Sequence, residues 1–153
     1  MSFLDLKLPP VALAVLVGLS MWGVATAWPA LVIPVPAKGP VAAVLVALGG
    51  AVGLAGVAAF RAHRTTVNPT RPGAATAVVR SGVYRWTRNP MYLGLALGLA
   101  GWAAYLANAG SLALLPAFVA YLNRFQIEPE ERALLARFGP DFAEYMAAVR
   151  RWI

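Results

Sequence analysis

Two short polar motifs hold most of the residues in this chain that could do chemistry, and each borders an apolar stretch. The first is Arg88-Asn89-Pro90-Met91-Tyr92-Leu93-Gly94, which begins a hydrophobic run. The second is Glu128-Pro129-Glu130-Glu131-Arg132, which follows the end of the next run. The chain has six acidic residues, and three of them lie in this second motif. Carboxylates gathered in this way indicate either a bound polar ligand or a set of structural ion pairs.

The composition predicts the scaffold that must hold these motifs. Hydrophobic residues make up 60% of the chain and charged residues 12%, which excludes an ordinary soluble domain. A helix needs about 20 residues to cross a bilayer. We therefore predict a single domain over residues 1–153, an all-α integral membrane protein with four transmembrane helices and a cytoplasmic C-terminal helical cap. The expected spans are residues 9–27, 40–60, 91–107 and 111–127.

The arginines predict the orientation of these spans. They are concentrated in segments 61–90 and 128–153, whereas loop 28–39 carries only Lys38 and residues 108–110 carry no charge. Basic residues accumulate on the cytoplasmic side of a membrane. Both termini and both motifs are then cytoplasmic, and the net charge of +7 indicates contact with anionic membrane lipids, not with nucleic acid.

The same composition limits the source and the available chemistry. An Ala-, Leu- and Arg-rich chain with two lysines suggests a prokaryote with GC-rich DNA, and Trp28-Pro29 argues against a cleavable signal peptide in the first span. With no cysteine and one histidine, the chain cannot form a thiolate nucleophile or, unaided, a zinc site. Catalysis would depend on carboxylates, Arg, Tyr and Asn acting with a borrowed cofactor.

The turns predict that the two motifs meet. Residues 108–111 form a tight turn, so the third and fourth spans should make an antiparallel hairpin whose bases bring Arg88 close to Glu130 and Glu131. Residues 65–73 are rich in turn formers and argue against a continuous helix there.

The tail predicts two short helices that cap the bundle. The first runs over residues 130–138 and ends at Gly139, and Pro140 suits the first turn of the second. The second has an apolar face that either rests on the membrane or folds over the bundle. That face comprises Phe142, Tyr145, Met146 and Val149. Arg150, Arg151 and Trp152 are expected at the lipid headgroups.

The two motifs in this order, with Gly82-Val83-Tyr84-Arg85 before the first and Arg137-Phe138-Gly139 after the second, resemble the isoprenylcysteine carboxyl methyltransferase family. The resemblance covers roughly residues 40–153, is greatest to small prokaryotic members, and extends to related phospholipid methyltransferases. Either motif alone would be weak evidence.

The resemblance implies an integral-membrane methyltransferase that uses S-adenosyl-L-methionine without a Rossmann domain. It also implies that the two motifs border the cofactor pocket. The implied cofactor-binding residues are Arg88, Asn89, Pro90, Tyr92, Gly94, Glu130 and Glu131. Asn89 departs from the histidine usual in the eukaryotic enzymes, and because an amide does not titrate near neutral pH, a proton-transfer role there is not expected.

The methyl acceptor is expected to be lipophilic or amphiphilic, and its chemistry would assign the catalytic residues. A carboxylate needs no base but favours a cation, which Arg124 or Arg132 would supply. An amine must lose a proton before attack, which makes Glu131 a candidate base. The alternatives are a phospholipid amine N-methyltransferase, and a membrane reductase or non-enzymatic membrane module. The chain has no glycine-rich dinucleotide fingerprint for a reductase.

Overall fold

The computed structural model describes residues 5–63 and 76–153, and these form helices and no strand. The all-helical prediction is therefore confirmed for this part of the chain, while the turn-rich stretch predicted at 65–73 lies outside it. The helices are α1 (Pro10–Ala27), η1 (Pro29–Leu31), α2 (Lys38–Ala62), η3 (Gly82–Arg85), α3 (Pro90–Leu106), α4 (Ala109–Leu122), η4 (Asn123–Ile127), α5 (Glu128–Phe138) and α6 (Pro140–Ala148).

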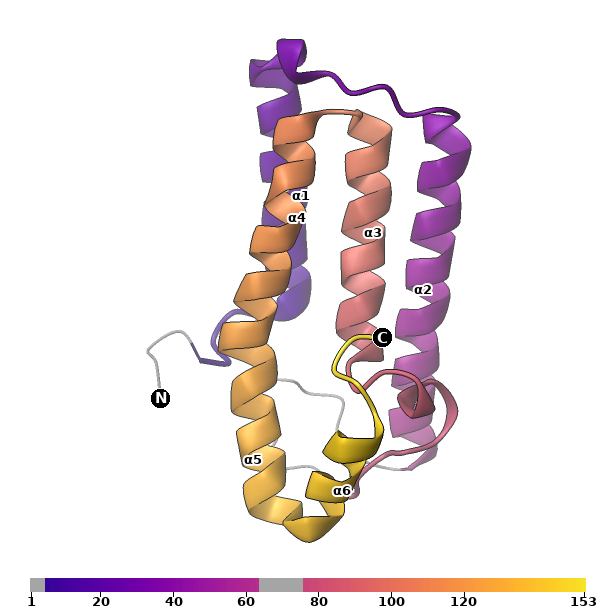
Figure 1. The fold of residues 1–153 in the computed structure, drawn as a ribbon, viewed down its shortest axis with the longest axis vertical. Helices are drawn as coiled ribbons and strands as arrows, with labels where there is room; N and C mark the ends of the chain where they lie inside the picture. The colour runs from indigo at the N-terminus through magenta and orange to yellow at the C-terminus, as the bar shows by residue number, and fades with distance from the viewer. Residues whose placement is uncertain (1–4, 64–75) are drawn as a thin grey trace.

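Four long helices run up and down in turn, with α3 between α4 and α2 in the view of Figure 1. Of the described helices, α1 and α2 are long and apolar enough to cross a membrane, and α3 is a shorter apolar helix. The predicted fourth span, residues 111–127, is helical throughout but is not one regular α-helix. The α-helix ends at Leu122, and Asn123–Ile127 continue as a π-helix directly into α5.

Helices α2 and α3 pack backbone against backbone because glycines line their contact. A Cβ atom on Gly94 would lie 2.5 Å from the carbonyl oxygen of Gly49. Towards the other end of the same contact, a Cβ on Gly101 would lie 2.9 Å from the carbonyl oxygen of Ala42. Small residues of this kind let membrane helices approach closely. The start of α3, which carries the first motif, is thereby fixed against α2.

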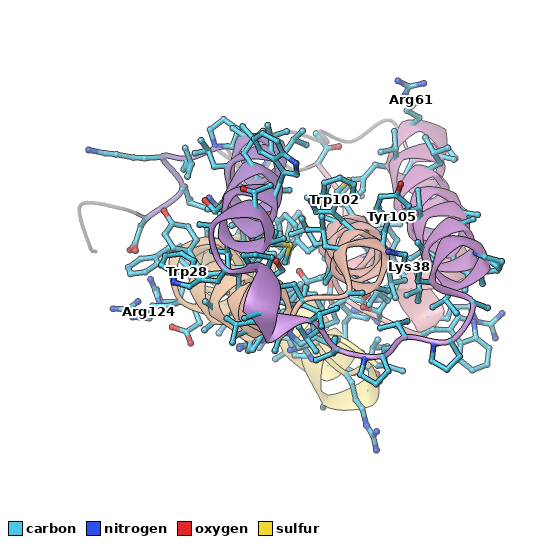
Figure 2. All side chains as sticks on the ribbon, turned by 90° about the horizontal axis from the view of Figure 1, so that it is seen from above. Trp28, Lys38, Arg61, Trp102, Tyr105 and Arg124 are labelled. Atoms are coloured by element: carbon cyan, nitrogen blue, oxygen red, sulfur yellow. The ribbon has the colours of Figure 1, made fainter. Side chains whose placement is uncertain are left out.

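Helices α1, α3 and α4 share the main apolar core, whose buried members include Met21, Leu99 and Phe118. The Trp102 indole donates a hydrogen bond to the Gly18 carbonyl at 3.0 Å, which ties α3 to α1, and Trp102 lies beside Tyr105 in Figure 2. Large apolar side chains also point outward from α1 and α2, as expected for lipid-facing helices. They include Val11, Val15, Leu19, Val44, Leu48 and Leu54.

The end of the bundle with the two interhelical turns is closed by neutral polar groups. We call this the loop end (Trp28–Ala37 and Ala107–Ser111). The Asn108 side chain caps α4 by accepting from the Ser111 amide at 3.1 Å, and it donates to the Trp28 carbonyl at 3.0 Å. The Ser111 hydroxyl donates to the Met21 carbonyl at 2.6 Å. The predicted hairpin between the third and fourth helices is confirmed.

At the opposite end, which we call the motif end, the tail folds back over the bundle (Figure 1). Helix α5 ends at Gly139, whose φ of 53° suits glycine, and α6 begins at Pro140 as predicted. Phe142 and Tyr145 on α6 pack into a second apolar cluster with Tyr84 of η3 and Phe60 of α2. The apolar face of α6 therefore covers the bundle, which decides between the two alternatives raised by the sequence.

Candidate functional site

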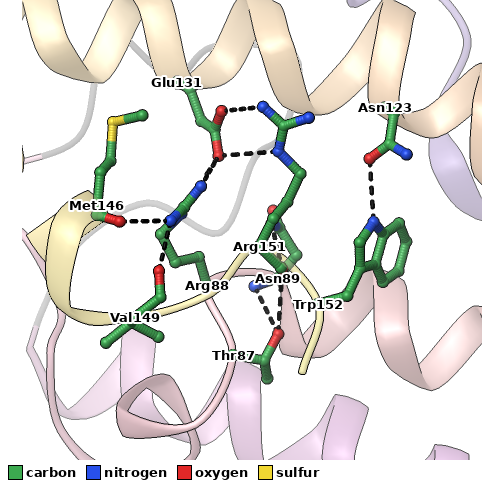
Figure 3. A network of polar contacts seen from close by, with 9 residues as sticks. All are labelled: Thr87, Arg88, Asn89, Asn123, Glu131, Met146, Val149, Arg151 and Trp152. Carbon is green, nitrogen blue, oxygen red and sulfur yellow. Dashed lines mark hydrogen bonds and ion pairs between the residues drawn. The ribbon is translucent and has the colours of Figure 1, made fainter.

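A carboxylate held by two guanidinium groups lies at the centre of the motif end (Figure 3). Arg88 donates to Glu131 Oε1 through Nη2 at 2.8 Å and through Nε at 3.2 Å. Arg151 donates to Oε2 through Nη2 at 2.6 Å and to Oε1 through Nε at 3.3 Å. The side chains of Arg88 and Glu131 are each only 11% exposed. Both oxygens of Glu131 are therefore occupied by charged donors.

The strap, which we define as Val149–Trp152, passes directly over the first motif. Its carbonyl groups accept from the Arg88 amide at 3.0 Å and from the Asn89 side-chain nitrogen at 2.9 Å. Arg88 Nη1 donates to the carbonyls of Met146, at 2.8 Å, and Val149. The strap thus occupies the polar groups at the start of α3.

Two further contacts hold the strap. The Thr87 hydroxyl donates to the Arg151 carbonyl at 3.3 Å and accepts from the Asn89 amide at 3.1 Å. The Trp152 indole donates to the Asn123 side-chain oxygen at 3.0 Å, which ties the strap to the π-helix. Trp152 also packs against the main apolar core.

Glu130, the neighbour of Glu131, has a different environment. Its Oε1 accepts a hydrogen bond from the Tyr92 hydroxyl at 2.5 Å, and within the described residues it forms no ion pair. Burial raises the pKa of Glu130 to about 8; the Tyr92 hydrogen bond lowers it, and the charge of Glu131 raises it. Glu130 is thus a partly buried acid that holds a proton near neutral pH and has no cation beside it among the described residues.

Tyr84 adds a buried hydroxyl at the motif end that has no partner among the described residues. Its ring is buried and meets Phe60 edge-on with centroids 5.1 Å apart, and its carbonyl accepts from the Tyr145 hydroxyl at 2.8 Å. The Tyr84 hydroxyl has no hydrogen-bond partner within the described part of the chain. Burial raises the pKa of Tyr84, and the charges of Tyr145 and Glu130 raise it further.

The structure brings five of the predicted site residues together at this end. They are Arg88, Asn89, Tyr92, Glu130 and Glu131. Two others have packing positions: Pro90 starts α3 and faces Gly56 of α2, and Gly94 faces Gly49.

The two arginines proposed to serve a carboxylate acceptor are engaged elsewhere. Arg124 points outward in Figure 2 and pairs with Glu128 at 3.6 Å. Arg132 pairs with Asp5 at 3.5 Å. Each of these arginine side chains is 54% exposed. The structure does not bring either one to the cluster around Glu131.

Sequence reasoning missed the role of the strap. Arg151 and Trp152 were expected at lipid headgroups, but their side chains turn inward to Glu131 and Asn123. The only available signal was the closeness of two arginines to a tryptophan, and that pattern is also typical of an interfacial anchor. Thr87 had no distinguishing sequence signal, and Tyr84 stood out only as part of Gly82-Val83-Tyr84-Arg85 before the first motif.

Comparison with known proteins identifies the family. The model of the phospholipid methyltransferase family matches residues 38–141, which is more than half of the chain and includes both motifs. The chain belongs to this family. A Haemophilus influenzae protein described as uncharacterized is 38% identical over 63 residues, which cover 41% of this chain and 100% of that protein. No solved structure matches.

Membership of the phospholipid methyltransferase family supports membrane methyltransferase activity, for which S-adenosylmethionine is the general methyl donor. The apolar outer surfaces of α1 and α2 agree with a membrane location. The isoprenylcysteine carboxyl methyltransferase family suggested by the motifs is related to this family, and the match itself does not distinguish the acceptors of the two groups.

Proposed function

We propose that this protein transfers a methyl group from S-adenosylmethionine to an amphiphilic acceptor at the motif end. The observation that carries the proposal is Glu130, a partly buried carboxyl that has a tyrosine hydroxyl beside it and no ion pair within the described residues. A buried carboxylate needs a cation or a proton. A cationic ligand is therefore the natural partner of Glu130 when the proton leaves.

The residues present fit the cofactor. It carries a sulfonium, an ammonium, a carboxylate and a ribose diol, and when bound it supplies an electrophilic methyl group. Glu130 suits the ammonium, and the Tyr84 hydroxyl, which has no partner among the described residues, suits a hydroxyl or an amine. Arg88 and Glu131 already satisfy each other, so we assign them to shaping the site.

Methyl transfer requires little covalent chemistry from the protein. Held by Glu130, the methyl donor would supply a methyl group to the acceptor atom and would itself be left as a neutral thioether. The protein orients the two reactants and excludes water. A site at one end of an apolar bundle suits this reaction, because the cofactor comes from water and the acceptor from the membrane.

The geometry favours an amine acceptor over a carboxylate. A carboxylate acceptor would need a cation, but Arg88 and Arg151 are both paired with Glu131. An amine must instead give up a proton before it attacks. Glu131 is poorly suited to take that proton because two guanidinium groups stabilise its charge, and Glu130 is assigned to the cofactor ammonium, so in this proposal the proton leaves to water. A phospholipid amine is thus the favoured acceptor, and an isoprenylcysteine-like carboxylate is the second candidate.

The proposal includes a membrane topology. We infer four spans, with α4 and the π-helix together forming the fourth, and with both described ends of the chain in the cytoplasm. The arginine-rich segments support this orientation, and it exposes the motif end to a cytosolic methyl donor. The proposed setting is a prokaryotic cytoplasmic membrane.

The test is calorimetric titration of S-adenosylmethionine and its demethylated product into detergent-purified protein. NADPH is the control for the reductase alternative. We expect the methyl donor to bind, Glu130→Gln to weaken binding at least tenfold, and Glu128→Gln to change it less than twofold. Glu128 is the matched control because it lies on the same helix and pairs with Arg124 at the surface.

Two outcomes would contradict parts of the proposal. Folded wild-type protein that binds no S-adenosylmethionine would overturn the methyl-donor assignment. Equal binding by Glu130→Gln and wild type would remove Glu130 from the site. Labelled methyl transfer to phosphatidylethanolamine vesicles, compared with transfer to a prenylated cysteine, then decides the acceptor.

A further inference from the structure

We propose that Arg151 is a positioning residue of the methyl-transfer site, which it builds by tying the strap to Glu131 and so to the first motif. This inference rests on the proposed function. It concerns a residue that lies outside the matched family region, since that region ends at residue 141.

The first step is the charge balance at Glu131. Its Oε2 accepts a hydrogen bond only from Arg151, at 2.6 Å, within the described residues, whereas Oε1 accepts from both arginines. The Glu131 side chain is 11% exposed, so water cannot readily replace a lost partner. Removing the Arg151 guanidinium therefore leaves a buried oxygen unsatisfied and one carboxylate with one cation.

The second step is the dependence of the strap on its side chains. Helix α6 ends at Ala148, and the residues after it form no helix or strand. The strap is placed by the Arg151 ion pair, the Trp152–Asn123 hydrogen bond and contacts from its carbonyl groups to the first motif. Arg151 is the only charged side chain that the strap itself contributes to these anchors in the described structure.

The third step connects the strap to the start of α3. The backbone carbonyls of Arg150 and Arg151 receive the Arg88 amide and the Asn89 side chain. Asn89 immediately precedes Pro90 at the start of α3, and Tyr92 follows within the first turn. A displaced strap would therefore release the segment that sets the Tyr92 hydroxyl against Glu130.

The fourth step is electrostatic. The groups that act on Glu130 are Tyr92 from α3, Tyr84 from η3 and Glu131 from its own helix. The negative charge of Glu131 disfavours ionisation of Glu130, and Arg88 and Arg151 offset that charge. Loss of Arg151 should therefore make Glu130 harder to ionise and move any pH dependence of cation binding upward.

Arg151→Ala is the variant, and Arg150→Ala is the matched control. Arg150 has the same charge and a neighbouring position, but it is exposed, and the structure shows only its backbone carbonyl in a contact. We expect Arg151→Ala to weaken S-adenosylmethionine binding at least tenfold and to raise the pH midpoint of binding. Arg150→Ala should stay within twofold. Arg151→Lys should recover part of the affinity, because lysine keeps the charge but not the two-pronged contact.

A second readout does not need the ligand. The chain has no cysteine, so Ile153→Cys, at an exposed position beside the strap, accepts a single spin label. We expect the label to become more mobile in Arg151→Ala and to keep its wild-type spectrum in Arg150→Ala. This readout is made in folded protein, as shown by an unchanged helical circular dichroism spectrum.

The two readouts separate the possible failures. An unchanged label spectrum in Arg151→Ala overturns the inference whether or not the ligand binds. A looser strap with wild-type affinity and pH midpoint also overturns it, because the strap would then be irrelevant to the site. If the wild type itself binds no methyl donor, the proposed function fails, and this positioning role fails with it even if the strap loosens.

Discussion

Tyr92 and Gly94 lie two residues apart in the first motif, yet they serve opposite sides of α3. Tyr92 turns to α5 and donates to Glu130 at 2.5 Å, whereas Gly94 turns to α2 and leaves no room for a side chain against Gly49. One sequence motif therefore contains two separate functions. The α5-facing residues carry polar chemistry, and the α2-facing residues hold the helix that presents it.

The second motif divides in the same way. Glu131 is saturated by Arg88 and Arg151, while Glu130 has a hydrogen bond from Tyr92 and no ion pair in the described structure. A carboxylate whose donors all come from the protein stabilises the local fold. A partly buried carboxyl that is not paired with a cation retains the capacity to bind one. This difference leads us to place the ligand at Glu130.

The largest expected effect comes from filling the α2-facing side. Gly94→Ala puts a Cβ 2.5 Å from a backbone oxygen, so the helices must separate. We expect a loss of about 3 kcal/mol in unfolding free energy, at the upper end of overpacking costs. Gly98→Ala, one turn later on α3, is the control because nothing lies within 4 Å of its added methyl group.

The Gly98 control should be neutral or slightly stabilising, since alanine favours a helix over glycine by up to about 1 kcal/mol. Denaturant unfolding in detergent, followed by circular dichroism, measures both variants. Equal stability of Gly94→Ala and Gly98→Ala would show that α2 does not approach α3 at Gly94 as closely as the structure indicates.

The second-largest expected effect is the pH dependence of ligand binding at Glu130, on the α5-facing side. If only ionised Glu130 receives a cation, the affinity for S-adenosylmethionine should rise with pH up to about 8. Each pH unit below that value should lower the affinity roughly tenfold, which corresponds to about 1.4 kcal/mol of binding free energy. Titrations between pH 6 and 8 measure the slope. A flat profile in wild type would contradict the role of the Glu130 proton, and Glu130→Gln should be flat in any case.

The proton on Glu130 has the opposite effect on folding stability. Because folding raises the pKa of Glu130 above its ordinary value near 4.5, the folded chain holds this proton more tightly than the unfolded chain does. Its contribution to stability is therefore fully present below about pH 4.5 and is lost as pH rises through about 8. Glu130→Gln should lose this pH dependence.

The sequence was sufficient to predict the helices and the meeting of Arg88 with Glu131. Apolar runs, Pro140 and Gly139 mark local boundaries, and a short hairpin necessarily brings its two bases together. The sequence could not predict which of the two glutamates pairs with the arginines. Each residue turns a helix by about 100°, so adjacent side chains face different partners. The unpredicted π-helix also shifts the phase of everything after Ile127.

The position of the strap could not be predicted from the sequence for a related reason. Arg151 lies far along the chain from Arg88, and no periodic pattern connects them. An arginine beside a tryptophan predicts an interfacial anchor when only its neighbours are considered. The inward turn of Arg151 depends on the tertiary placement of a buried Glu131, which only the folded chain reveals.

The smallest expected effect tests whether the polar side of α3 extends to Tyr84. Tyr84→Phe removes a buried hydroxyl that has no partner in the described structure, so stability should rise by about 1 kcal/mol. If a bound ligand satisfies that hydroxyl, the affinity for S-adenosylmethionine should fall by a similar free energy, roughly fivefold.

Tyr145→Phe is the control, because its hydroxyl donates to the Tyr84 carbonyl and its loss should destabilise the fold. Opposite signs for the two variants in thermal unfolding, with a loss of affinity in Tyr84→Phe, would make Tyr84 part of the ligand site. A stabilised Tyr84→Phe variant with wild-type affinity would confine that site to Tyr92 and Glu130.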